Sequence, residues 1–136
     1  MTRICLDSNV LVAAFIARGL CADVLRLVLS GYDLVIPEIV AEEVRRVLTT
    51  KLKAGPSALA AVEAVLERCS VVPNDDIPCP ISLRDPDDER VLAAAVAAGV
   101  DILVSGDQDL LVAAEESPIR ILSPRAFLTL VRGGTL

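Results

Sequence analysis

The sequence predicts an α/β fold, a three-layer α/β/α sandwich with a mainly parallel central sheet. Short apolar or β-branched segments alternate with longer segments of helical periodicity along the chain. This alternation is typical of βαβ units with right-handed crossovers. Hydrophobic residues make up 54% of the chain but aromatic residues only 2%. The core must therefore consist of small aliphatic side chains, which suit helices packed on a parallel sheet.

In the first half of the chain, glycine and proline separate the predicted elements. Gly31 ends the second predicted helix, and Gly55 with Pro56 stands between the third and the fourth. Short apolar runs before the first and third helices are predicted to be strands. The expected order is a strand at 3–7, helices at 8–17 and 21–31, a strand at 33–37, and helices at 38–52 and 57–69.

The second half begins with a short strand and a proline-rich loop that runs to about Asp85. The same alternation then resumes. No repeat, low-complexity tract or long linker divides the chain, so we expect one domain spanning residues 1–136. The expected order is a strand at 70–73, a helix at 86–99, a strand at 101–107, a helix at 108–116, a strand at 119–123 and a helix at 124–133.

The composition argues against several classes of protein. The chain has no histidine, and its four cysteines have no CxxC spacing, so neither a zinc site nor a disulfide framework is expected. Cys5 lies in an apolar run and is predicted to be a small core residue. The apolar stretches are interrupted or too short to span a bilayer, and no signal-peptide layout is present. We therefore expect a soluble, cytoplasmic protein with no membrane association.

The net charge of −6 argues at first against a nucleic-acid partner, because phosphate binding favours a basic surface. The segment 45–53, however, holds four basic residues and no acid. For any single one of these side chains a solvated helix face is the simpler interpretation. An acidic protein can still bind phosphate where its carboxylates hold divalent cations, since the cation then sets the local charge.

Asp88 occupies an unusual position for a carboxylate. At about 100° per residue it falls on the same face of the predicted helix at 86–99 as Val91, Leu92 and Ala95. That face should pack against the core, where a carboxylate is costly unless it is paired or bound to metal.

The other acids at the start of this helix have local explanations. Asp85 is expected to cap the helix, and Pro86 suits its first position. Asp87 and Glu89 point about 100° to either side of Asp88, so we expect them to face solvent or compensate the helix dipole. These roles explain why acids gather here, but not why one of them lies on the apolar stripe.

Two further acids follow predicted strands. Asp7 closes the first strand and Asp107 follows the strand that contains Val104. In open α/β sheets, ligands bind outside the carboxyl ends of the strands, and we expect these two strands to be neighbours. Alternatively, Asp7 and Asp107 could simply be N-caps of the helices that follow them, and Asp109 could compensate a helix dipole.

Glu43 repeats the pattern of Asp88. It lies within the apolar stripe of the predicted helix at 38–52, at an angle between Ile39 and Val47, whereas Glu42 falls on the polar side. Like charges packed together repel and raise one another's pKa values, and oxygen-bound divalent cations are the ordinary resolution. Because no histidine or apparent cysteine nucleophile is present, metal-activated water is the plausible reactive group.

Three segments resemble a known family. "CLDSNVLVAA", "AEEVRRVL" and "DPDDERVLAAAVAAGVDILVSGDQDLL" are similar, in order and spacing, to the motifs of PIN-domain nucleases. The resemblance extends from Arg3 to the last predicted helix. It implies a metal-dependent ribonuclease that uses one or two Mg²⁺ or Mn²⁺ ions. Its acidic cluster would consist of Asp7, Glu43, Asp88 and Asp107.

The same resemblance implies further roles and partners. Asp109 would be a supporting acid that could also bind the metal, and Ser8 and Ser105 stand where such domains often keep a hydroxyl. Small single-domain members are often VapC-like toxins of bacterial toxin–antitoxin pairs, which implies an RNA substrate, a cognate antitoxin and a homodimer. The first candidates for contacts with the RNA backbone are Arg45, Arg46, Lys51 and Lys53.

Two alternatives from other functional classes are also compatible with the sequence. A phosphatase could use Asp7 as its nucleophile, although such an enzyme would need a second acid where Asn9 stands. A binding module could keep the fold without turnover, although the presence of all four acids argues against this.

Overall fold

A fully parallel, five-stranded sheet forms the centre of the computed structural model, which describes residues 1–134. Helices connect its strands. The elements are β1 (Arg3–Leu6), α1 (Ser8–Ile16), α2 (Leu20–Gly31), β2 (Asp33–Pro37), α3 (Glu38–Arg46), a π-helical turn (Val47–Lys51), α4 (Pro56–Arg68), β3 (Ser70–Val72), α5 (Pro86–Ala97), β4 (Ile102–Val104), α6 (Gln108–Val112), a 3₁₀ turn (Ala113–Glu116), β5 (Arg120–Leu122) and α7 (Pro124–Arg132).

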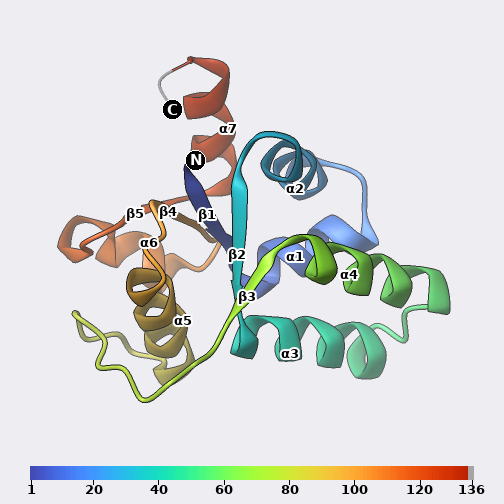
Figure 1. Ribbon diagram of the computed structural model, residues 1–136, viewed down its shortest axis with the longest axis horizontal. Coiled ribbons are helices and arrows are strands. Elements are labelled where there is room, and N and C mark those ends of the chain that lie inside the picture. Colours follow the sequence, from blue (N-terminus) through green and yellow to red (C-terminus); the bar gives the residue numbers. More distant parts are fainter. Residues whose placement is uncertain (135–136) are drawn as a thin grey trace.

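The strand order is β3-β2-β1-β4-β5, so β1 lies in the middle of the sheet. Figure 1 shows α5 and α6 on one side of the sheet and α1, α2 and α4 on the other. Helix α7 packs against α2 and β5. The expected α/β fold with a parallel central sheet between helical layers is confirmed. No helix among residues 1–134 is both long and apolar enough to cross a membrane.

The core is aliphatic, as the composition predicts. The β1 residues Ile4, Cys5 and Leu6 are completely buried, and Phe127 is the single aromatic side chain among the fully buried residues described. Cys5 is therefore a core residue, as expected, and all four cysteines are free. The burial of whole strands is what a sheet covered on both faces requires.

The helix predicted at 38–52 does not continue unchanged. Regular α-helix ends at Arg46, and the chain widens into the π-helical turn, in which the Leu52 amide donates to the Val47 carbonyl oxygen at 3.0 Å. The Thr50 hydroxyl donates to the Arg46 carbonyl oxygen at 2.6 Å. A side-chain donor to a helix carbonyl competes with the regular backbone ladder, which accounts for the change.

Lys53, two residues after this turn, adopts a left-handed conformation with a φ of 47°, which is unfavourable for a residue with a Cβ atom. We expect Lys53→Gly to raise the free energy of unfolding by about 0.5–1 kcal/mol, since glycine adopts this conformation without the steric cost. Denaturant titration measures the change. In the matched control Lys51→Gly, the glycine falls inside the helical turn and should cost up to about 1 kcal/mol. If Lys53→Gly lowered the free energy of unfolding as much as Lys51→Gly does, the prediction would be contradicted.

Candidate metal centre

The carboxyl ends of β1 and β4 meet at the point where the strand order reverses. From β1 the chain moves to β2 and β3 in one direction, whereas β4 and β5 lie on the other side. Leu6 pairs with Val104, and the Asp7 amide donates to the Val104 carbonyl oxygen at 3.0 Å. The prediction that these two strands are neighbours is confirmed. Crevices beside such adjacent carboxyl ends are where open α/β sheets bind ligands.

Asp7 is buried and held by hydrogen bonds to both of its carboxylate oxygens. Oδ1 accepts from the Ser8 amide at 2.8 Å, and Oδ2 accepts from the Ser105 hydroxyl at 2.8 Å. Asp7 is therefore the N-cap of α1, as its helix-start role predicts. It also lies in the crevice between β1 and β4, so the capping and the site roles are compatible.

Ser105 connects Asp7 with the start of α6. Its side chain is completely buried, and its oxygen accepts from the Asp107 amide at 3.0 Å while its hydroxyl donates to Asp7. Asp107 in turn caps α6, with Oδ1 accepting from the Asp109 amide at 2.8 Å. Ser8, the other expected hydroxyl residue, is also buried.

Asp88 lies on the buried face of α5, where the helical spacing places it. Asp88 is only 9% exposed, and Val91 and Leu92 on the same face of α5 are also buried. Its Oδ2 atom is buried and has no hydrogen-bond partner in the described chain. An unpartnered buried carboxylate oxygen is costly, so this atom calls for a cation or another donor.

The other acids of this helix start differ in role. Asp85 caps α5 by accepting from the Asp87 amide at 2.9 Å, and Asp87 is exposed beside Arg90 at 3.9 Å. Glu89 is half-buried instead of facing solvent, because its Oε2 atom accepts from the Leu83 amide at 3.2 Å and anchors the preceding loop. Helical spacing could not reveal this contact, since it depends on how the loop folds back.

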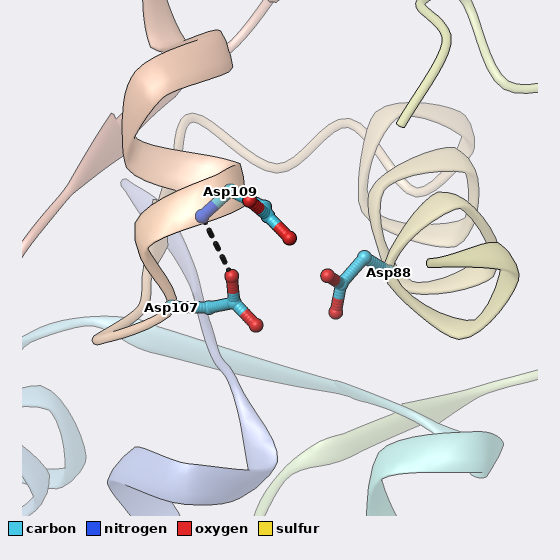
Figure 2. A group of neighbouring side chains, drawn as sticks. All are labelled: Asp88, Asp107 and Asp109. Carbon is cyan, nitrogen blue, oxygen red and sulfur yellow. Dashed lines mark hydrogen bonds between the residues drawn. The ribbon is translucent and has the colours of Figure 1, made fainter. Parts of the chain in front are cut away.

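Figure 2 shows Asp88 of α5 facing Asp107 and Asp109 at the start of α6. One carboxylate oxygen from each of these residues lies within 4.8 Å of the others. Asp109, expected as a supporting acid that could also bind the metal, belongs to this closest group because the capping turn places it beside Asp107. Three converging carboxylates, one with an orphaned buried oxygen, are a donor set that fits a hard divalent cation.

Asp7 and Glu43 lie outside that closest group but belong to the same electrostatic neighbourhood. Burial raises the pKa of Asp7, hydrogen bonds from Ser105 and Ser8 lower it, and the charges of Glu43 and Asp107 raise it again. Glu43 is half-buried on α3. Asp7, just after β1, therefore interacts with acids of α3 and the β4–α6 turn, and its own charge affects Asp88 of α5.

The pKa of Asp88 is the most strongly displaced among these acids. Burial, followed by the negative charges of Asp107, Asp7, Asp85 and Asp109, raises it to about 7. The described residues provide no cation against this carboxylate. A bound divalent cation would reverse the balance by favouring the ionised form.

The expected basic residues lie on α3 and the turn after it. The Arg45 guanidinium forms two hydrogen bonds to the Glu63 carboxylate of α4, both at 2.8 Å, so its charge is already paired. Arg46, Lys51 and Lys53 are exposed and form no ion pair within residues 1–134. Three of the four basic candidates are thus available to an anionic ligand.

A family model described as the PIN domain matches residues 3–109 of the chain. The chain belongs to the PIN domain family. The resemblance read from the three sequence segments is therefore confirmed, and the matched range includes Asp7, Glu43, Asp88, Asp107 and Asp109. No curated protein matches the sequence significantly.

Solved structures show the same PIN fold at low sequence identity. A chain in the DNA-bound VapBC structure from Salmonella typhimurium is 21% identical, with 91% of this chain and 99% of that chain covered and a TM-score of 0.62. A chain in VapBC2 from Rickettsia felis, bound to a promoter DNA fragment, is 14% identical over 90% and 98%, with a TM-score of 0.65. A chain in FitAcB from Neisseria gonorrhoeae is 16% identical over 90% and 98%, with a TM-score of 0.64.

Removing the Ser105 hydroxyl should weaken the acidic site of this PIN domain. In Ser105→Ala, Asp7 loses the donor to Oδ2 and the Asp107 amide loses its acceptor. We expect Mn²⁺ affinity to fall by about 10-fold or more, the usual result of removing a group that orients metal ligands. Isothermal titration calorimetry measures the affinity.

Ser117→Ala is the matched control, because the Ser117 oxygen likewise accepts a backbone amide two residues further on, from Ile119 at 3.2 Å. It lies just before β5, and it should leave Mn²⁺ affinity unchanged. An unchanged affinity in Ser105→Ala would remove Ser105 from the site.

Proposed function

We propose that the chain is a metal-dependent ribonuclease that hydrolyses phosphodiester bonds in RNA, acting as a single nuclease domain over residues 1–136. The observation that carries this proposal is the inward carboxylate of Asp88, which lies with those of Asp107 and Asp109 at the switch point of the sheet and has a buried, unpartnered Oδ2 atom. A core-facing carboxylate with no partner has no evident structural use, and divalent cations are its usual partners in such crevices.

Asp7, Glu43, Asp88 and Asp107 are proposed to hold one or two Mg²⁺ or Mn²⁺ ions, with Asp109 as a further ligand. When bound, a divalent cation lowers the pKa of a water ligand and neutralises charge that develops on the scissile phosphate. Ser105 orients Asp7 and the capping turn of Asp107, so that the carboxylates are positioned before RNA arrives.

Contacts with the RNA are proposed to depend on phosphates. Arg46, Lys51 and Lys53 would hold the backbone beside the cleaved bond, with Arg45 reaching it only by leaving Glu63. The sequence has one tyrosine, two phenylalanines and no tryptophan, so base stacking contributes little. Such an enzyme would recognise the shape and charge of RNA more than its bases.

A phosphatase that uses Asp7 as its nucleophile is less well supported. Both carboxylate oxygens of Asp7 accept hydrogen bonds, which stabilise the carboxylate and make it a weaker nucleophile, and the side chain is buried. Asn9 also stands where a phosphatase of this kind would need its second acid. A catalytically inactive binding module has no observation in its favour beyond the fold itself.

We further propose that the chain acts in the cytoplasm as the toxin of a toxin–antitoxin pair, with an antitoxin partner and as a homodimer. The support is that chains in VapBC and FitAcB structures share its fold over about nine tenths of its length. A short gene immediately upstream, encoding a DNA-binding N-terminus and an amphipathic C-terminus, is the expected genomic arrangement.

The proposed reaction is tested with a structured RNA incubated with purified protein in Mg²⁺, in Mn²⁺ and in chelator. We expect internal cleavage products with either metal and none in chelator. RNA binding without cleavage in any metal would instead identify a binding module. A phosphorylated aspartate trapped by rapid quench with a phosphomonoester would identify a phosphatase.

A further inference from the structure

Asn74 connects the two helices that carry Glu43 and Asp88. It lies in the loop between β3 and α5, outside the acidic site. Its Oδ1 atom accepts from the Ile39 amide at 2.6 Å, in the first turn of α3. Its Nδ2 atom donates to the Arg90 carbonyl oxygen at 3.2 Å, in α5. One side-chain amide therefore joins three segments that are distant in sequence.

Helix α3 depends on this contact because it has no cap of its own. Pro37 occupies the N-cap position and makes no side-chain hydrogen bond, since proline has no acceptor in its side chain. The first amides of a helix need acceptors from elsewhere, and Asn74 supplies one to Ile39 from 35 residues away. The contact thus fixes where the N-terminus of α3 lies relative to the loop.

The two hydrogen bonds of the Asn74 side chain, to Ile39 and to Arg90, form what we call the Asn74 bridge. Each of these two partners lies close in sequence to an acid of the site. Ile39 is one helical turn before Glu43, on the same side of α3. Arg90 follows Asp88 by two residues in α5, and α3 and α5 contact each other directly. The charges of Glu43 and Asp88 each interact with that of Asp7, so the position of α3 relative to α5 affects the acidic site.

We infer that Asn74 is a positioning residue that holds α3 against α5, so that Glu43 and Asp88 keep their places in the proposed metal site. This inference rests on the proposed metal-dependent function. It assigns to Asn74 no contact with metal or RNA, only the placement of two helices that carry ligands. Residues that orient ligands in this way commonly affect metal affinity by 10-fold or more.

The test compares Mn²⁺ affinity, measured by isothermal titration calorimetry, with thermal stability. Asn74→Ala removes both hydrogen bonds of the bridge and should lower Mn²⁺ affinity by about 10-fold. Ser123→Ala is the matched control, because the Ser123 hydroxyl oxygen caps α7 by accepting from the Ala126 amide at 3.1 Å. Both variants should lose a similar few degrees of melting temperature, but Ser123→Ala should bind Mn²⁺ as the wild type does.

Asn74→Asp separates the two bonds. It keeps an acceptor for the Ile39 amide, so amide exchange in the first turn of α3 should stay slow, whereas it loses the donor to Arg90. Its added negative charge would by itself favour a cation, so a lower Mn²⁺ affinity would support the bridge. Affinities within twofold of wild type in Asn74→Ala and Asn74→Asp would overturn the inference while leaving the ribonuclease proposal intact. A wild-type protein that does not bind Mn²⁺ would overturn both.

Discussion

Asp88→Asn is expected to lower metal-dependent RNA cleavage by roughly 100-fold or more, a larger loss than that caused by removing a group that only orients a ligand. Asparagine keeps the shape of the side chain but not its charge. The Asp88 carboxylate faces those of Asp107 and Asp109 (Figure 2), so the substitution removes one of three converging carboxylates. Initial rates of cleavage in Mg²⁺ and in Mn²⁺ measure the effect.

Two neighbours of Asp88 provide the controls. Asp87→Asn neutralises an exposed carboxylate of the same helical turn, 3.9 Å from Arg90, and should leave activity largely intact. Asp85→Ala removes the cap of α5 and should cost about 1 kcal/mol of stability with a smaller effect on turnover. Full activity in Asp88→Asn would contradict the assignment of this carboxylate to the metal site.

The position of Asp88 could be predicted from the sequence because it depends only on helical periodicity. The same holds for Asp7 and Asp107, since the carboxyl ends of parallel strands meet at one edge of a sheet. The alternative capping roles were also correct, because a carboxylate that caps a helix with one oxygen can face a site with the other. For Asp107, Oδ1 accepts from the Asp109 amide, whereas Oδ2 accepts no hydrogen bond within residues 1–134.

Other parts of the site depend on tertiary contacts that local patterns do not encode. Arg45 resembled its basic neighbours in sequence, but its pairing with Glu63 follows from the packing of α3 beside α4. Helical spacing predicts that Glu89 faces solvent or compensates the helix dipole, but not that it anchors the loop before α5 by accepting from the Leu83 amide. The only sequence signal for Asn74 was indirect: Pro37 leaves the first turn of α3 without its own cap, but does not indicate which residue supplies the acceptor.

In metal-free buffer, the wild-type protein is expected to lose on the order of 2 kcal/mol of stability between pH 5 and pH 8 because of Asp88. The pKa of this carboxyl is about 7 in the folded chain, raised by burial and by neighbouring acids, against about 4 in the unfolded chain. The folded state therefore holds more protons than the unfolded state between these values. The stabilising contribution is complete below about pH 4 and is lost as the pH rises through 7.

Asp88→Asn has no carboxyl to ionise at this position, so its stability should not fall for this reason as the pH rises. The variant should therefore be more stable than the wild type at pH 8 in chelator, though not at pH 5. The stability of the variant should still fall somewhat with rising pH, because the pKa of Asp7 is also raised in the folded chain. Denaturant titrations of both proteins across this pH range measure the difference. A variant less stable than the wild type at pH 8 would show that the carboxylate has a structural role instead.

Mn²⁺ should reverse the order of the two proteins. At pH 8 a concentration of about 100 times the dissociation constant should stabilise the wild type by about 2.7 kcal/mol, and Asp88→Asn should gain far less at the same concentration. At pH 5 the wild type should also gain less, because protonated Asp88 must lose its proton before it can bind a cation. The acids that destabilise the metal-free fold would then be the ones through which metal stabilises it, as expected where a sequence retains repulsive carboxylates for function and not for folding.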